Sequence, residues 1–246
     1  VCYLLCYGLV RERVTFNSQP LKHTDNNVFR MLGNAVKNRA LISIIAASVV
    51  MLLAQLTLQQ MTNYIYPNYY GNASMQSVST LAMSGGMIVA AFIAKPIARK
   101  FGKAEISAFS NLLAGLGSFL IYFIRPQNVL VYIGIQTICW LGLGVFSMVS
   151  WALITDVIDY SEIKNGIRED GSVYALYSFA RKLGQAAASG VTGALLTAIG
   201  YSEATAFDKN VLEGIFDIST LVPAVGFVLL AVILWFWYHL LQKFPA

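Results

Sequence analysis

Long apolar runs alternate with short polar segments along most of the chain. Six runs contain no Asp or Glu, and they cover residues 41–61, 77–97, 106–124, 129–155, 174–199 and 221–241. Each suits the roughly 17–25 helical residues that cross the hydrocarbon core of a membrane. Because a spanning segment must satisfy its own backbone hydrogen bonds, the six runs are predicted to be helices.

Composition supports the same class of protein. The chain has 246 residues, of which 57% are hydrophobic and 12% are charged, whereas a soluble domain carries about 25% charged residues. The sequence therefore predicts an all-α integral membrane protein. Positively charged residues gather at alternate ends of the runs, so the net charge of +5 reflects topology and predicts no nucleic-acid partner.

The polar segment before the first run divides the chain into three parts. Residues 1–10 are interpreted as the end of a preceding transmembrane helix, and 11–39 as a cytoplasmic linker rich in Lys and Arg. Residues 40–246 are predicted to form a six-helix bundle. The charge bias places the linker and the C-terminus in the cytoplasm of a multi-pass protein of the cell membrane.

The fifth run carries two adjacent cations near its middle, within "YALYSFARKLGQAAASG". Arg181 and Lys182 there are costly inside a membrane unless a ligand, water or an acid compensates them. Helical spacing predicts that they share one face with the polar residues around them. That face consists of Tyr174, Tyr177, Ser178, Arg181, Lys182 and Gln185.

Weaker polar stripes occur on two other runs. The first run carries Gln55, Gln59 and Asn63, and the fourth carries Gln136, Trp140, Ser147 and Trp151. Amide, hydroxyl and indole groups beside cations suit a polyhydroxylated ligand, because aromatic faces pack on the C–H surface of a sugar. The alternatives are ordinary hydrogen bonds between helices and ordinary packing of the two Trp residues.

Acidic residues are expected only in or beside loops. Asp156 and Asp159 end the fourth run one turn apart, and Arg168 follows in a charged segment. Such a charge network at a cytoplasmic helix end suits a gate that closes in one state and opens in another. The three Cys and two His residues form no catalytic or metal-binding pattern, so neither an enzyme nor a metal site is predicted.

The segment "DVIDYSEIKNGIREDGSVYALYSFARKLGQA" resembles the tenth and eleventh helices of the glycoside–pentoside–hexuronide:cation symporters. These proteins, among them the melibiose permease, belong to the major facilitator superfamily. "ARKFGK" at 98–103 resembles the basic hairpin of that superfamily. The likeness covers nearly the whole chain, as the end of helix six, the central loop and the C-terminal six-helix bundle.

This resemblance implies a sugar site between two bundles and symport with Na⁺, H⁺ or Li⁺, without a cofactor. Lys182 matches a lysine at the sugar and cation site of family members, and Tyr177, Ser178 and Arg181 would line the cavity. Ser147 replaces a sugar-contacting aromatic of the melibiose permease, which argues against melibiose as the substrate. The cation-binding acids would lie in the missing N-terminal six-helix bundle.

Two functional hypotheses follow from the sequence. The first is the C-terminal half of a sugar or glycoside transporter that works by alternating access, with the lipid bilayer, a coupling cation and the N-terminal bundle as its partners. Its predicted substrate-binding residues are Lys182, Arg181, Tyr177, Ser178, Gln185, Ser147, Trp140 and Gln59. The second is a truncated six-helix protein that binds or senses a ligand without transporting it. Arg181 makes a hexuronide possible, since a guanidinium binds a carboxylate with two hydrogen bonds, and neutral pentosides stay equally open.

Overall fold

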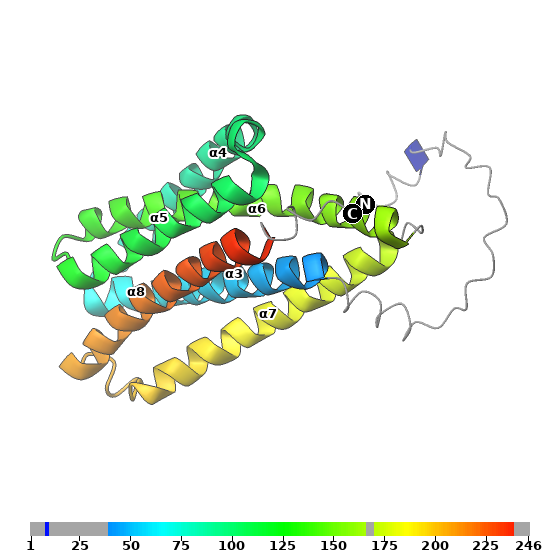
Figure 1. Cartoon of the computed structure of the whole chain (residues 1–246). Helices are drawn as coiled ribbons and strands as arrows, with labels where there is room; N and C mark the ends of the chain where they lie inside the picture. Colours follow the sequence, from blue (N-terminus) through cyan, green and yellow to red (C-terminus); the bar gives the residue numbers. More distant parts are fainter. Residues whose placement is uncertain (1–7, 10–38, 166–169, 239–246) are drawn as a thin grey trace.

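The computed structural model describes residues 8–9, 39–165 and 170–238. Its main elements are six long helices (Figure 1). They are α3 (Arg39–Tyr64), α4 (Met75–Phe101), α5 (Lys103–Ile124), α6 (Val129–Asn165), α7 (Asp170–Ala198) and α8 (Lys209–Val232). Short π-helices continue two of them, η1 (Ile65–Tyr69) after α3 and η2 (Ile233–Tyr238) after α8. The predicted all-α fold is confirmed, while the predicted 1–10 helix end and 11–39 linker lie almost wholly outside the described residues.

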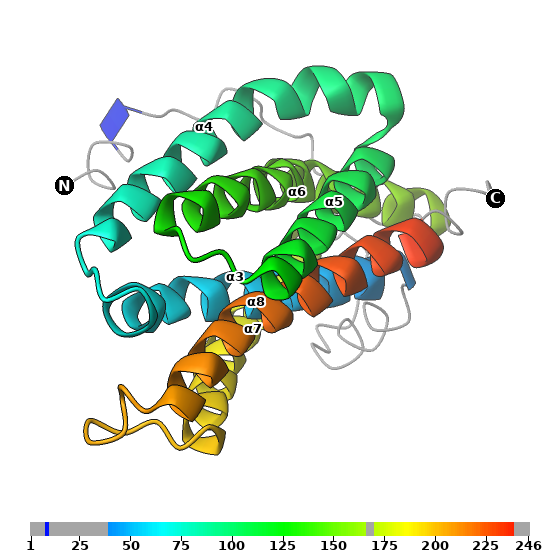
Figure 2. The same cartoon turned by 90° about the vertical axis from the view of Figure 1, so that its left-hand side faces the viewer.

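The helices pack as one bundle with two edge helices. α5 packs between α6 and α8, and α3 packs against α7 and α8. α4 lies mainly on α6 at one edge, and α7 lies mainly on α3 at the opposite edge (Figure 2). Because α7 has few neighbours in this bundle, much of its surface is left open.

Small residues bring the central helices close together. A side chain at Gly142 of α6 would place its Cβ 2.5 Å from the carbonyl oxygen of Ser110 on α5. A side chain at Gly226 of α8 would place its Cβ 2.6 Å from the Cβ of Ala54 on α3. Close approach of this kind is how helices gain packing contacts in a membrane, where lipid is as apolar as the side chains.

Five of the described helices are long and apolar enough to cross a membrane by length and composition. α7 is less apolar than these five helices, because Arg181, Lys182 and the polar and small residues around them interrupt its apolar sequence. The six predicted helices are all present. That α7 also crosses the membrane stays a prediction.

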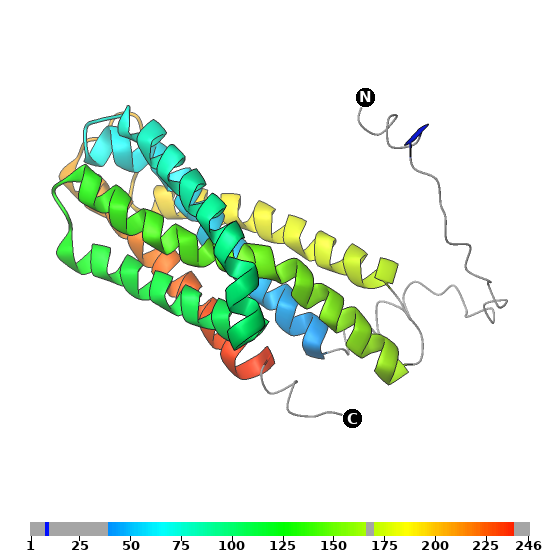
Figure 3. The ribbon, with the colours of Figure 1, turned by 90° about the horizontal axis from the view of Figure 1, so that it is seen from above.

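Two predicted helix ends are wrong. α6 does not stop near Thr155 but continues to Asn165, and it extends beyond the start of α3 and the end of α8 (Figures 1 and 3). Charged residues can continue a helix at no cost once it has left the apolar layer. Asp156 and Asp159 therefore lie within this helix and not in a loop.

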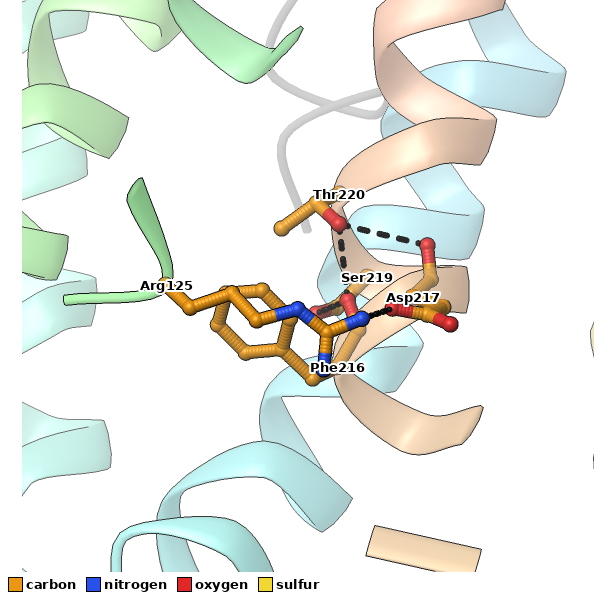
Figure 4. Close-up of polar contacts among 5 residues, drawn as sticks. All are labelled: Arg125, Phe216, Asp217, Ser219 and Thr220. Atoms are coloured by element: carbon orange, nitrogen blue, oxygen red, sulfur yellow. Dashed lines mark hydrogen bonds and ion pairs between the residues drawn. The ribbon is translucent and has the colours of Figure 1, made fainter. Parts of the chain in front are cut away.

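The last helix begins at Lys209 and not near Leu221, so Asp217 lies in its third turn. The expectation that acids occur only in or beside loops is wrong here, and an ion pair is the reason. The Nη2 atom of Arg125 lies 2.8 Å from Oδ1 of Asp217, and its guanidinium also covers the ring of Phe216 at 5.5 Å (Figure 4). The pair joins the end of α5 to α8.

An aromatic cluster surrounds this ion pair at the same end of the bundle. Tyr69 of η1 packs on Phe216 with ring centroids 4.8 Å apart, and Tyr70 contacts Tyr132 of α6 at 5.5 Å. The Tyr70 hydroxyl donates to the carbonyl oxygen of Pro126 at 3.0 Å, and burial raises the pKa of this phenol. The cluster fixes the end of α3 to α6 and α8.

Candidate functional site

The polar face of α7 divides into a packed line, formed by Tyr177 and Thr192, and an open line, formed by Ser178, Lys182 and Gln185. Tyr177 and Thr192 are buried against α3, where the Tyr177 hydroxyl lies 2.9 Å from Oγ of Ser48. Thr192 donates to Thr57 of α3 at 3.2 Å. Ser178 and Lys182, by contrast, are exposed. The predicted single face is thus partly an interface between helices, because α3 covers one side of it.

Arg181 lies between the two lines and is half-buried. Its Nη1 donates to the Tyr177 hydroxyl at 3.2 Å. Its guanidinium carbon lies 5.6 Å from the centre of the Tyr177 ring and 5.7 Å from that of Trp151 on α6. Both distances are within the range of a cation–π contact. Trp151 keeps 51% of its surface exposed beside this contact.

Lys182 projects from the open line. Its Nζ donates to Oε1 of Gln185 at 3.2 Å, one turn further along α7. Among the described residues, neither Lys182 nor Arg181 has a carboxylate in ion-pair contact. Their bonding partners here are neutral, so both positive charges stay uncompensated within this part of the chain.

The other predicted binding residues are placed in different surroundings. Ser147 of α6 is half-buried, and its hydroxyl lies 3.7 Å from the sulfur of Met51 on α3. Trp140 is only 4% exposed and belongs to the hydrophobic core, so its contact with a ligand stays a prediction. Gln136, one turn before it, is buried as well.

Gln59 lies on the open side of α3 and is exposed. One turn later, Asn63 accepts a hydrogen bond of 2.7 Å from Nε2 of Gln76 on α4. Gln60, the next residue to Gln59, donates to Ser189 of α7 at 3.4 Å. Ser189 lies one helical turn after Gln185 on α7. Gln59, beside Gln60, is therefore about one turn beyond the end of the open line.

The predicted charge network has a partner that sequence reasoning missed. Lys103, the first residue of α5, donates to both carboxylate oxygens of Asp156 at 2.7 Å. The expected partner Arg168 lies outside the described residues, and Asp159 is exposed on α6. Lys103 belongs to the basic hairpin noted in the sequence, yet no spacing rule links it to an acid 53 residues away.

One groove lies away from these residues. It runs between α5 and α8, has a volume of about 320 Å³, and is lined by apolar side chains such as Phe109, Leu112 and Trp235. It contains no predicted binding residue. Among the described residues, no three His, Cys, Asp or Glu side chains gather as ligands for a metal ion.

Comparison with known proteins identifies the class. The family described as MFS/sugar transport protein matches residues 1–241. The chain therefore belongs to this family of the major facilitator superfamily, in agreement with its resemblance to the glycoside–pentoside–hexuronide:cation symporters. Family membership makes it a multi-pass membrane protein and relates it to transporters.

Three relatives illustrate the range of the family. The uncharacterized symporter YjmB of Bacillus subtilis is 26% identical over 98% of this chain and 52% of its own length. A glucuronide carrier protein homolog of Escherichia coli is 27% identical over 96% of this chain and 51% of its own. The isoprimeverose transporter of Lactiplantibacillus pentosus is 31% identical over 75% of this chain and 39% of its own. The chain thus spans about half the length of the curated relatives that it matches.

Proposed function

We propose that this chain is the C-terminal half of a secondary active transporter for sugars or glycosides. Transport would proceed by alternating access and would be driven by symport of Na⁺ or H⁺, in the cell membrane. The family and the names of the relatives support sugar transport. The coupling ion, the N-terminal bundle and the cytoplasmic position of the linker and C-terminus belong to the proposal.

One observation carries this proposal most directly. Arg181 and Lys182 lie near the middle of the 29-residue helix α7, and their described partners are the neutral side chains of Tyr177, Trp151 and Gln185. Charges at such a depth face a water-filled cavity or a partner and not lipid. The open line of α7 therefore forms one wall of the substrate pathway, which the second bundle completes.

Roles for the individual residues follow from their exposure. Lys182, Gln185 and Ser178 offer donors and acceptors to sugar hydroxyls from α7, and Gln59 offers an amide from α3. Tyr177 acts through Arg181, since its hydroxyl is buried. Ser147 of α6 is half-buried beside Met51 of α3. The acids that bind the coupling cation are assigned to the other half of the transporter.

The ion pair of Lys103 and Asp156 suits a role in the conformational cycle. Both side chains are about two-fifths exposed, at 41% and 39%, so the pair can separate and re-form at low cost in water. It ties the start of α5 to the C-terminal part of α6, next to the buried residues Val157 and Ile158. A pair in that place would hold one state of the cycle and release it in the other.

Sugar uptake by the full-length protein in membrane vesicles tests this function. We expect uptake that depends on an imposed Na⁺ or proton gradient, and we expect Lys182→Ala to abolish most of it while the protein still inserts. Lys209→Ala is the matched control, because Lys209 is exposed at the start of α8 and outside the open line. Binding of sugar without uptake would favour a sensor instead. Equal uptake by Lys182→Ala and wild type would remove Lys182 from the site.

A further inference from the structure

The contact between Trp151 and Arg181 joins two helices that touch little elsewhere. α6 and α7 separate along most of their length, as Figures 1 and 2 show. Trp151 spans the gap, with its indole 5.7 Å from the guanidinium carbon and 5.8 Å from the Tyr177 ring in an edge-on arrangement. The guanidinium is thus held by one aromatic side chain from each helix.

A chain of hydrogen bonds fixes the direction in which the guanidinium points. Arg181 can only donate, so the Tyr177 oxygen accepts from it at 3.2 Å. The Tyr177 proton is then free to be donated to Ser48, whose oxygen lies 2.9 Å away. Because Tyr177 is fully buried, this chain anchors Arg181 to the packed interface of α3 and α7.

This arrangement orients the cation and leaves its charge available. A guanidinium has five N–H donors, and one hydrogen bond to a described residue accounts for only one of them. Aromatic faces attract the cation but carry no negative charge that could neutralise it. An arginine that serves only the fold inside a membrane would be expected to pair with an acid or with backbone carbonyls.

We propose that Arg181, positioned by Trp151 and Tyr177, is the residue by which the transporter selects a sugar ring carrying an anionic oxygen group over the neutral ring. This inference rests on the proposed function and deepens it. The planar fork of the guanidinium matches two oxygens of a carboxylate or a sulfonate. Trp151 is a positioning residue, because it sets the guanidinium in place for that group.

Equilibrium binding to the purified full-length transporter tests the inference. The probes are methyl glucuronide and methyl glucoside, which share a ring and differ in the group at C6. We expect the glucuronide to bind wild type more tightly by about tenfold or more, as one charge-assisted hydrogen-bonded pair provides. Arg181→Gln is expected to remove this preference, so that its loss of affinity for the glucuronide is about tenfold greater than any loss for the glucoside.

Variants of Trp151 separate positioning from packing. Trp151→Leu should weaken binding of the glucuronide more than of the glucoside, and Trp151→Phe, which keeps an aromatic face, should restore part of the difference. Trp235→Leu is the matched control, since Trp235 is 56% exposed on η2 and lies in the groove away from α7. It should leave both affinities unchanged.

Three results would overturn the inference. The first is that wild type binds the two probes with equal affinity. The second is that Arg181→Gln still prefers the glucuronide. The third is that Trp151→Leu loses the same affinity for both probes. Each of them is compatible with ion-driven uptake of a neutral sugar. The proposed function fails by a different result, which is the absence of gradient-driven uptake for every sugar offered.

Discussion

At the scale of single residues, the environment of α7 decides what each polar side chain can do. Tyr177 and Ser178 are adjacent in sequence, yet the first is fully buried and the second is exposed. Helical spacing predicts that both belong to the polar side of α7. It could not show that α3 covers Tyr177, because the partner Ser48 lies 129 residues away in the sequence. The candidate site was therefore predicted as a set of residues, while its division into packed and open lines was not.

Tyr177→Phe tests the packed line. The substitution keeps the ring under Arg181 and removes the hydroxyl that contacts Ser48 and Arg181. Loss of one such hydrogen bond typically costs about 1 kcal/mol, so we expect a lower melting temperature of the purified protein. Ser178→Ala, on the open line, should leave the melting temperature unchanged. A stability of Tyr177→Phe equal to wild type would show that the hydroxyl contributes nothing to the packing of α7.

At the scale of the elements, apolar runs locate helices well and locate their ends poorly. The runs at 77–97 and 106–124 correspond to α4 and α5 within a few residues. The errors at α6 and α8 have two physical causes. Charged residues continue α6 beyond the apolar layer, and the ion pair with Arg125 allows Asp217 inside α8. The pairs Lys103–Asp156 and Arg125–Asp217 join residues that are 53 and 92 positions apart, so they leave no periodic signal in the sequence.

Gly142 of α6 provides a test of close helix packing. A Cβ at this position would lie 2.5 Å from the Ser110 carbonyl oxygen on α5. We expect Gly142→Ala to destabilise the protein by about 1–3 kcal/mol, as overpacking does. Gly134→Ala is the control on the same helix, because no atom lies within 4 Å of its added Cβ. Thermal unfolding in detergent measures both, and equal melting temperatures would contradict the packing of α5 on α6.

Lys103 and Asp156 test the proposed gate between α5 and α6. Because both side chains are substantially exposed, Asp156→Asn should change stability by less than about 1 kcal/mol. Its transport rate should nevertheless fall if the pair holds one state of the cycle, as proposed above. Exchanging the two residues, as Lys103→Asp with Asp156→Lys, should restore part of the rate. A double variant no faster than the single variants would argue against a role for the pair itself.

At the scale of the whole molecule, the described helices form a bundle with an open polar side. α4 and α7 are its edge helices (Figure 2). Among the described residues, the cations Arg181 and Lys182 on α7 contact only neutral partners. Charges of this kind are stable in a membrane only where water or a partner reaches them. The proposed function therefore requires that the open line of α7 face an aqueous pathway in the proposed full-length transporter.

The most direct test is the chemical accessibility of this line. Cysteine is introduced at Ser178, at Lys182 or at Leu112 in a cysteine-free background of the full-length protein, and intact vesicles are treated with a charged thiol reagent. We expect modification at Ser178→Cys and Lys182→Cys, and slower modification when a transported sugar is present. Leu112→Cys, in the apolar groove between α5 and α8, should stay unmodified. If Ser178→Cys and Lys182→Cys were as unreactive as Leu112→Cys, α7 would not line an aqueous pathway, and the account would be contradicted.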